Sequence, residues 1–239
     1  MMFRGFMRWC SARPEYRALI DRDAGRAAAI VEALPQVTKR TDCLEAAQLP
    51  GWFAGAAKLG NRTIATYLKA LLITGSRREE MAGLRWADVD FRWNRVTLAD
   101  KVNNTRTIPL TPYLAQLLAT LPRINDFVFA GKSASGHIEE PRSNFAKVNL
   151  LAGVTKLTIH GLRRSFSLLG ESAGAPAGAI AQIMGHSPDS IAESYRPRSV
   201  DALRPYLAQI EAHILQQAGI VFDANAEPCK LCLVVGVVS

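Results

Sequence analysis

Apolar residues recur every three to four positions along most of this 239-residue chain, the spacing of helices that bury one face. The clearest example is the segment 62–73, which Asn61 precedes as an N-cap and Gly75 follows, where a positive φ can end a helix. Its expected inward face consists of Ile64, Leu68, Leu71 and Leu72. The pattern therefore predicts a core helix over residues 62–73.

Other helices are predicted on both sides of this segment, because Gly, Pro or a capping residue bounds each apolar stretch. Asp42 is the expected N-cap of a helix that Pro50 and Gly51 interrupt. Thr111 and Pro112 combine a cap with a proline at the first helical position. The expected helical ranges are 3–10, 24–34, 42–49, 78–84, 112–121, 143–151, 160–173, 177–184, 189–195 and 200–217.

The helical period is interrupted near the middle of the chain. Residues 95–98 and 105–110 are rich in Val, Thr and Ile, and Asn103 and Asn104 between them suit a turn. Residues 127–129, Phe-Val-Phe, are a further short strand candidate. The sequence thus predicts a mainly α-helical fold with a small antiparallel β-sheet near residues 95–130, an α+β fold.

The chain is expected to have three parts. Residues 1–40 contain two short helical stretches, too few to enclose a core of their own, so they must pack against something else. Residues 41–220 form the main domain. Residues 221–239 have no helical period, end in an apolar run and are expected to be an irregular tail with no assigned role.

Composition narrows the function classes. The chain has 49% apolar and 21% charged residues, which is ordinary for a globular protein and excludes disorder throughout. Its net charge of +8 favours a polyanionic partner such as nucleic acid. No run of 18 apolar residues is present, and four scattered cysteines are too few for a disulfide framework. The expected location is the cytoplasm, with no membrane partner.

Several kinds of site are excluded by motif. The chain has no phosphate-binding glycine loop, no Gly-x-Gly-x-x-Gly and no His-Glu-x-x-His. Cys229 and Cys232 have zinc-like spacing, but a structural zinc site needs four ligands and no others lie nearby. The acidic residues form no close cluster. We therefore expect no metal and no cofactor.

What remains is a set of cationic and imidazole side chains together with one tyrosine. Each has an ordinary alternative: an exposed ion pair for an arginine, a helix cap for a histidine, a solubilising charge for a hairpin lysine. Four other tyrosines compete with Tyr195, but only Tyr195 follows a Gly-His pair at an offset of nine residues. Tyr67 and Tyr113 are expected to be core or half-buried, and Tyr206 belongs to the last helix. The set consists of Arg77, Lys101, His160, Arg163, His186 and Tyr195.

These residue types are the ones that phosphodiester cleavage without a metal requires. Two planar arginine forks can hold the non-bridging oxygens and stabilise the charge that grows in the transition state. A lysine can protonate the departing 5′ oxygen, and a histidine can take the proton of the attacking hydroxyl. A tyrosine near such cations can attack phosphorus as its phenolate.

Five segments of the main domain carry a resemblance to a known family. In their order and spacing they resemble the catalytic domain of the tyrosine recombinases, or phage integrase family, and specifically the prophage-type integrases. The resemblance runs from about Thr41 to Ile220. The segments are TGSRREEMAGLRWADVDF (74–91), DKVNNTRTIPL (100–110), HGLRRSF (160–166), AQIMGHSPDSIAESYRPR (181–198) and LRPYLAQIEAHILQQAGI (203–220).

The resemblance implies a role for each residue of the set. Arg77 corresponds to the first catalytic arginine, Lys101 to the β-hairpin lysine, His160 and Arg163 to the His-x-x-Arg box, His186 to the Gly-His box and Tyr195 to the nucleophile. Glu80 matches a carboxylate that supports the region of Arg77. Arg78 and Arg164 are expected to contact the DNA backbone or to be plain surface residues.

The resemblance also implies function and partners. It implies site-specific DNA recombination through a covalent 3′-phosphotyrosine, which integrates or excises a prophage or other mobile element. The implied partners are double-stranded DNA, further copies of the chain in a tetramer on DNA, and accessory DNA-bending or directionality proteins. The implied location is the nucleoid of the cytoplasm.

Residues 1–40 are then the last helices of a core-binding domain, and the chain is expected to be truncated at its N-terminus. Two alternatives stay open at this point. One is a DNA-binding remnant without turnover, and the other is a type IB topoisomerase-like enzyme that nicks and closes DNA.

Overall fold

The computed structural model describes residues 2–20, 42–100, 104–154, 156–186 and 197–223. The chain divides into two compact units, residues 1–41 and 42–239. The first unit contains α1 (Met2–Ser11) and the single turn α2 (Pro14–Arg17). The helix expected over 3–10 is confirmed, and the one expected over 24–34 lies outside the described residues.

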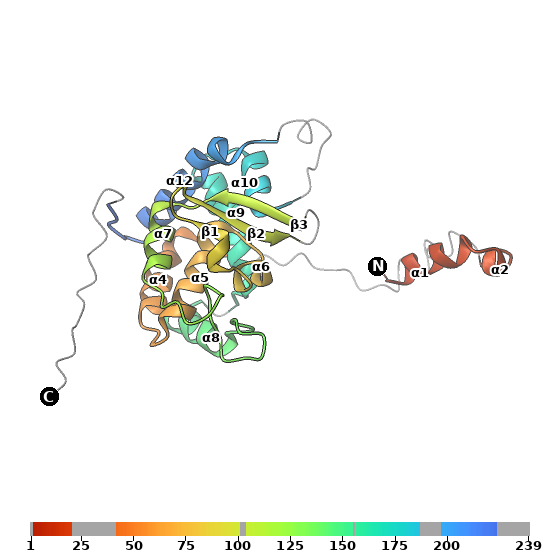
Figure 1. The fold of residues 1–239 in the computed structure, drawn as a ribbon, viewed down its shortest axis with the longest axis horizontal. Coiled ribbons are helices and arrows are strands. Elements are labelled where there is room, and N and C mark those ends of the chain that lie inside the picture. Colours follow the sequence, from red (N-terminus) through yellow and green to blue (C-terminus); the bar gives the residue numbers. More distant parts are fainter. Residues whose placement is uncertain (1, 21–41, 101–103, 155, 187–196, 224–239) are drawn as a thin grey trace. The chain divides into compact units, whose positions relative to one another are not determined.

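The second unit is mostly helical with one small sheet, as the sequence predicts (Figure 1). Its sheet is antiparallel in the order β1-β2-β3, with β1 (Val89–Asp90), β2 (Arg95–Asp100) and β3 (Asn104–Pro109). Two 3-10 turns, η2 (Ala46–Gln48) and η3 (Trp86–Asp88), precede α4 and β1. The α-helices described in this unit are α4 (Leu49–Ala57), α5 (Arg62–Thr74), α6 (Arg78–Ala82), α7 (Pro112–Ala119), α8 (Arg142–Leu151), α9 (Ile159–Ser172), α10 (Ala177–Met184) and α12 (Val200–Gln217).

Helix α5 is the centre of the core. The side chain of Asn61 accepts a hydrogen bond from the N–H of Ile64 at 3.1 Å, and Gly75 ends the helix with a φ of 60°. Leu68 and Leu72 are fully buried, and α5 packs against α4, α7, α9 and α12. The predicted cap and end of this helix are therefore confirmed. Of its predicted inward face, Leu68, Leu71 and Leu72 are buried, and Ile64 is partly buried against the core.

The sheet turns one face toward the helices. Val96 and Leu98 of β2 are buried, and they lie opposite Ile108 and Arg106 of β3. Because alternate residues of a strand share a face, Arg106 points to the same side as these apolar neighbours. Helix α12 packs against β3, and α6 packs against β2.

The strand expected over 127–129 is wrong. Phe127 makes only a single β-bridge, to Arg85, and the N–H of Val128 donates to the carbonyl of Leu84 at 2.9 Å. This segment pairs with the loop before η3 and not with an edge of the sheet. Instead β1, which the sequence pattern did not predict, pairs with β2 through Val89 and Val96.

The helix expected over 42–49 is also wrong, because only the 3-10 turn η2 forms before α4, and Asp42 is not a helix cap. Its carboxylate accepts hydrogen bonds from the N–H of Thr158 at 2.9 Å and the hydroxyl of Thr158 at 2.6 Å, and it pairs with Arg164. Glu45 occupies the N-cap position of η2. Pro50 is the second residue of α4, where its missing N–H costs no helical hydrogen bond, so α4 continues through Gly51.

Helix α7 begins after Thr111, but the capping oxygens come from α12. The hydroxyl of Thr111 donates to the buried carboxylate of Glu211, which also accepts from the N–H groups of Tyr113 at 3.0 Å and Leu114 at 3.2 Å. Phe222 packs edge-on against Tyr113 at 5.2 Å between ring centroids. The chain after α12 therefore stays in contact with this unit through Phe222. None of the described helices has the length and apolar character needed to span a bilayer.

Candidate active site

Arg77 is the N-cap residue of α6, so it leaves the turn after α5 in an extended conformation. Its backbone N–H donates to Oε2 of Glu80 at 2.9 Å, which satisfies one donor at the helix start. Its Nη1 donates to Oε1 of Glu80 at 2.6 Å, and its Nη2 donates to the carbonyl of Gly185 at 3.0 Å. The side chain is 33% exposed, so it reaches the surface while both ends of its fork are held.

Arg163 extends from α9 toward the end of α10, which Arg77 also contacts. It is buried, and its Nη1 donates to the carbonyls of Gly75 at 2.6 Å and Met184 at 2.8 Å. Gly75 is required here because a Cβ on it would lie 2.4 Å from Cδ1 of Phe166. The positive φ of Gly75 and its lack of a side chain thus allow α5 to end against α9.

Arg106 of β3 completes an arrangement that we call the arginine cluster: Arg77, Arg106 and Arg163 around Glu80 and the end of α10. Nε of Arg106 donates to the carbonyl of Ile183 at 3.1 Å, and Nη2 donates to Oε2 of Glu80 at 2.7 Å. Three arginines therefore hold three successive carbonyls, those of Ile183, Met184 and Gly185. The last carbonyls of a helix lack helical partners and carry partial negative charge, so cations are favourable there.

Glu80 keeps its charge inside this cluster. Burial raises the pKa of its carboxyl, but hydrogen bonds from Arg106 and Arg77 outweigh burial and hold the pKa below the ordinary value of 4.5. The side chain is 5% exposed and bridges two guanidinium groups. The expectation that Glu80 supports the region of Arg77 is therefore confirmed by direct contact.

Arg106 was not among the residues predicted from the sequence, although a signal was present. It stands two residues before Ile108 on a strand whose alternate positions face the core. A charged residue at an inward position is rarely buried without a partner, so it points to a hidden acid. That acid is Glu80, and only the fold brings the two together.

His186 directly follows the end of α10 whose carbonyls accept hydrogen bonds from the three arginines. Gly185 is the C-cap with a φ of 74°, and the N–H of His186 donates to the carbonyl of Ala181 at 2.9 Å. The imidazole is exposed. A Cβ on Gly185 would lie 2.8 Å from Nη1 of Arg106, so glycine at this point lets the arginine pack closely against the turn.

The other residues of the expected set are placed as follows. His160 is exposed at the start of α9, one turn before Arg163, and the hydroxyl of Thr158 caps this helix by accepting from the N–H of Gly161 at 3.0 Å. Lys101 and Tyr195 lie outside the described residues, as does the helix expected over 189–195. The structure therefore brings together Arg77, Arg163 and the backbone that leads into His186.

The two tyrosines expected in helical cores are buried as predicted. Tyr67 is fully buried and its hydroxyl donates to the carbonyl of Arg78 at 2.9 Å, while Tyr113 is 8% exposed. Burial raises the pKa of both phenols, and the charge of Glu79 adds to the effect at Tyr67. Neither is suited to act as a phenolate nucleophile.

Arg164 does not have the role expected of it. A DNA contact or a plain surface position was predicted, but its guanidinium pairs with Asp42 and its Nε donates to the carbonyl of Asp42 at 3.1 Å. It therefore ties the beginning of the second unit to α9. Arg78 is partly exposed and pairs with Glu79 and Glu140.

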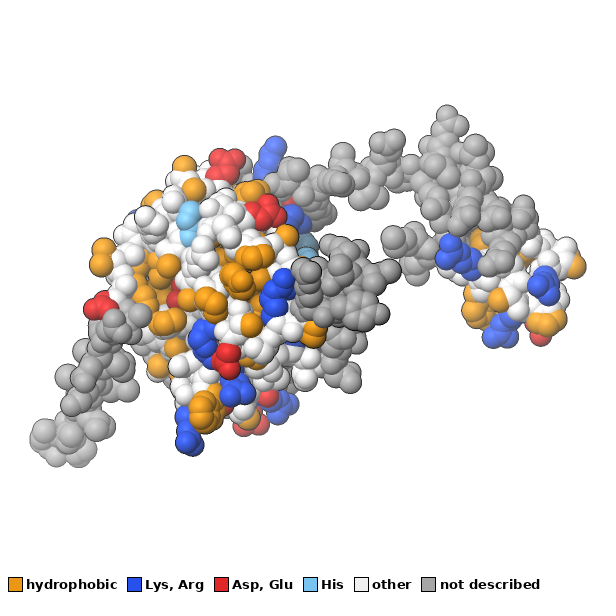
Figure 2. All heavy atoms as spheres, turned by 90° about the horizontal axis from the view of Figure 1, so that it is seen from above, with side chains coloured by type: hydrophobic (Ala, Val, Ile, Leu, Met, Phe, Trp, Pro, Cys, Tyr) orange, Lys and Arg blue, Asp and Glu red, His pale blue; other side chains and the backbone are white. Residues whose placement is uncertain are grey.

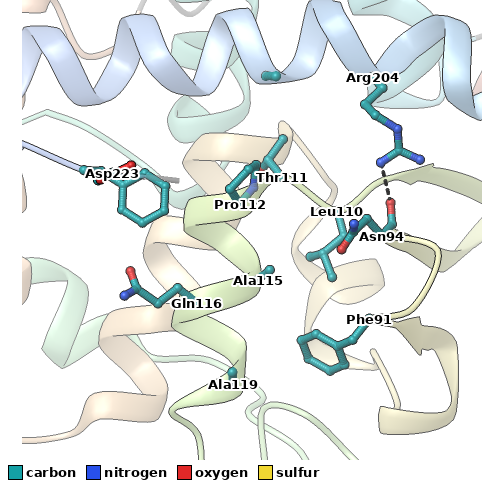
Figure 3. Close-up of a pocket in the computed structure, with 12 residues that line it drawn as sticks. Phe91, Asn94, Leu110, Thr111, Pro112, Ala115, Gln116, Ala119, Arg204 and Asp223 are labelled. Atoms are coloured by element: carbon teal, nitrogen blue, oxygen red, sulfur yellow. Dashed lines mark hydrogen bonds between the residues drawn. The ribbon is translucent and has the colours of Figure 1, made fainter. Parts of the chain in front are cut away.

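A separate pocket of about 510 Å³ lies between α7, α12 and the turn after β1 (Figure 3). Pro112, Ala115 and Phe222 supply apolar walls, and Nη1 of Arg204 donates to the carbonyl of Asn94 at its rim. Its described lining includes no member of the arginine cluster. Within the described part of the chain, no group of three His, Cys, Asp or Glu side chains is arranged to hold a metal ion.

Surface charge does not by itself locate a site. On the face seen in Figure 2, Lys and Arg side chains are scattered among apolar and acidic ones. The described Lys and Arg side chains are thus not gathered into a single patch on that face. The candidate site is defined by the geometry of the arginine cluster.

Comparison with known proteins identifies the family to which the chain belongs. Residues 47–200, more than half of the chain, match the model of the phage integrase family. The chain belongs to this family, whose members are also called tyrosine recombinases.

Particular relatives extend the match. Prophage integrase IntF of Escherichia coli (strain K12) is 40% identical over an alignment of 235 residues, and the match covers 95% of this chain and 50% of IntF. The chain therefore spans about half the length of that relative.

Solved structures have the same fold. The integrase from mycobacterium phage Brujita gives a TM-score of 0.59 at 18% identity, covering 90% of this chain and 74% of that one. A lambda integrase tetramer bound to a Holliday junction gives 0.54 at 16% identity, covering 80% and 59%.

Proposed function

We propose that this chain cleaves and rejoins DNA strands in site-specific recombination, with Tyr195 as the nucleophile. The observation that carries the proposal is the position of Arg77 and Arg163, held on the neighbouring carbonyls of Gly185 and Met184 directly before His186. Membership of the phage integrase family and the likeness to IntF support it.

In this proposal Arg77 and Arg163 bind the non-bridging oxygens of the scissile phosphate. Both are fixed through backbone carbonyls and Glu80 before any substrate arrives, so little reorganisation is needed when charge grows in the transition state. Guanidinium groups suit this task because they stay protonated and match the geometry of a phosphate.

The proton steps are assigned to three further residues. The oxygen of Tyr195 forms a bond to phosphorus while the bond to the 5′ oxygen breaks, and the phenol proton passes to His160. Lys101 protonates the departing 5′ oxygen, and His186 donates a hydrogen bond to the phosphate. A 5′ hydroxyl of the partner strand then attacks the 3′-phosphotyrosine and releases Tyr195. The phosphotyrosine retains the bond energy, so this scheme needs no ATP.

The proposed partners are duplex DNA and further copies of this chain. The lambda integrase of similar fold was solved as a tetramer on a Holliday junction, which supports a tetramer on two duplexes here. Helix α12, which follows the Tyr195 segment, is the proposed element that contacts a neighbouring copy. Residues 1–40 are proposed as the end of a core-binding domain, and residues 41–220 as the catalytic domain. The proposed role is integration or excision of a prophage, by analogy with IntF.

A trapping assay tests the proposal. The full chain is incubated with nicked duplexes taken from the DNA that flanks its gene, so that the short 5′-hydroxyl fragment is lost and religation is blocked. We expect a protein–DNA adduct that resists denaturation and is abolished in Tyr195→Phe. Tyr206→Phe is the matched control, because Tyr206 lies on α12 among core-facing residues and should leave adduct formation unchanged.

The other outcomes contradict the proposal in different ways. DNA binding without adduct on any of these duplexes would indicate a remnant without turnover. Relaxation of supercoiled DNA without recombinant product would indicate a topoisomerase-like enzyme. An adduct that persists in Tyr195→Phe would remove Tyr195 from the mechanism.

A further inference from the structure

We propose that Arg106 is a positioning residue for the strand-cleavage step, acting on Arg77 through Glu80 and on the end of α10 through Ile183. The inference rests on the proposed function. It is carried by the contacts that Arg106 makes from the inward face of β3.

The contact of Arg106 with Glu80 determines which oxygen of Glu80 accepts from the guanidinium of Arg77. Oε2 of Glu80 accepts from Nη2 of Arg106 at 2.7 Å and from the backbone N–H of Arg77 at 2.9 Å. The guanidinium of Arg77 therefore reaches only Oε1 through Nη1, and its Nη2 donates to Gly185. Arginine and carboxylate otherwise favour a bidentate pair. Without Arg106, Glu80 would attract both terminal nitrogens of Arg77 and rotate its fork away from Gly185.

The contact of Arg106 with Ile183 affects Arg163 and His186. Nε of Arg106 donates to the carbonyl of Ile183, and Arg163 donates to the carbonyl of the next residue, Met184. The side chain of Arg106 also packs against Gly185, where an added Cβ would lie 3.0 Å from Cδ of Arg106. Arg106 thus fixes the turn of α10 from which His186 projects.

Arg106 differs from Arg77 in its contacts and its access to DNA. Arg106 is 9% exposed and donates to Glu80 and to Ile183, whereas the side chain of Arg77 is 33% exposed. A phosphate on the DNA surface can approach Arg77, but Arg106 lies behind it on Glu80. Its effect should therefore appear in the rate of cleavage and not in the affinity for DNA.

The first test is a double-mutant cycle measured on saturating nicked duplex. Arg106→Ala should slow adduct formation by about 10- to 100-fold, as expected for a misplaced catalytic group, and leave the Kd for DNA unchanged within about twofold. Adding Arg106→Ala to Arg77→Ala should slow adduct formation by a smaller factor than Arg106→Ala does in the parent, because the part of its effect that passes through Arg77 is already lost. Arg106→Lys keeps the charge beside Glu80 but not the planar fork, so it should recover part of the lost rate.

A matched control excludes a general loss of stability. Arg204 also holds backbone carbonyls, those of Asn94 and Trp93, but these lie in the turn before β2 and not at the end of α10. Arg204→Ala should match the parent in rate at saturating DNA. If Arg106→Ala and Arg77→Ala multiply their effects, or if Arg106→Ala weakens DNA binding as much as it slows cleavage, Arg106 is not a positioning residue.

The second test does not depend on activity. Amide hydrogen exchange of the free full chain should be about tenfold or more faster at residues 184–186 in Arg106→Ala, with residues 207–215 of α12 unchanged. Unchanged exchange at 184–186 would overturn the inference even if the parent cleaves DNA. Faster exchange in Arg106→Ala, together with a parent that forms no adduct, would uphold the contact while the proposed function fails.

Discussion

Arg77 and Arg163 donate to neighbouring carbonyls at the end of α10, Arg77 to Gly185 at 3.0 Å and Arg163 to Met184 at 2.8 Å. The two cations come from segments far apart in the sequence, yet they share one short stretch of backbone. A shift of that stretch would move both guanidinium groups and His186 together. The end of α10 is therefore the element on which the geometry of the site depends.

The first prediction concerns the two arginines themselves. Arg77→Ala and Arg163→Ala should each slow adduct formation by on the order of 100-fold or more, because each removes a preorganised donor to the transition-state charge. The measurement is the single-turnover rate on saturating nicked duplex.

Arg78→Ala is the matched control for this prediction. Arg78 adjoins Arg77 in sequence, but its guanidinium pairs with Glu79 and Glu140. Its substitution should leave the saturated rate within a factor of about two to three. Rates near that of the parent in both Arg77→Ala and Arg163→Ala would remove these residues from the mechanism.

The second prediction concerns Gly185. Gly185→Ala should lower the free energy of unfolding by more than the roughly 1–2 kcal/mol that a left-handed alanine costs, because its Cβ would also collide with Arg106. It should slow adduct formation as well. Gly219→Ala is the control, since Gly219 has a similar φ of 68° but open space around its Cβ. Urea unfolding of both variants separates backbone strain from collision, and equal losses would contradict the packing described.

The third prediction concerns Asp42, which joins the start of the second unit to α9. Asp42→Asn should lower the free energy of unfolding by about 1–3 kcal/mol, because Arg164 and the N–H of Thr158 would lose a charged acceptor. The measurement is urea denaturation near neutral pH. A loss below about 0.5 kcal/mol would show that the carboxylate contributes little, as exposed pairs do.

The same pair predicts a dependence on pH. Burial raises the pKa of Asp42, but hydrogen bonds from Thr158 and the charge of Arg164 outweigh burial and hold the pKa below 3.8. A carboxyl whose pKa is lower in the folded state adds stability above its unfolded pKa, and this is lost as pH falls through the folded value. The difference between the parent and Asp42→Asn should therefore be constant above about pH 5 and shrink below pH 3.8.

The parent must be compared with Asp42→Asn because Glu211 changes the pH dependence of stability in the opposite direction. Burial raises its pKa above 4.5, and the hydrogen bonds from Thr111 and the N-terminus of α7 only partly offset this. Protonation of Glu211 thus favours the folded state as pH falls. A parent–variant difference that grows on acidification would contradict the arrangement at Asp42.

Local signals in the sequence were enough to predict most of the described helices, though not α4, and two of the three strands. Asn61 and Gly75 mark the ends of α5 within its own sequence, and the period of α12 gives its full range. Asp42 could not be predicted in this way, because its partners Thr158 and Arg164 lie 116 and 122 positions later. A capping residue next to an apolar stretch was the local interpretation, and a long-range ion pair replaced it.

Part of the candidate site could also be predicted from the sequence, and part depends on long-range contacts. Residue types and spacing were enough to select Arg77 and Arg163, but not the carbonyls that hold them, since backbone contacts leave no mark in the sequence. Arg106 was visible as a charge on an inward strand position, yet its role depends on Glu80 and Ile183, which only the fold brings near. The catalytic roles of all six residues of the set stay predictions, and Lys101 and Tyr195 lie outside the described residues.

The most direct test of the proposed chemistry identifies the amino acid that is joined to DNA. After trapping on a nicked duplex, the adduct is digested with nuclease and protease, and the nucleotide-bearing peptide is sequenced by mass spectrometry. We expect a phosphodiester on the oxygen of Tyr195, the residue before Arg196. A nucleotide on Tyr16, Tyr206 or any serine, with Tyr195 unmodified, would contradict the assignment of Tyr195 as the nucleophile.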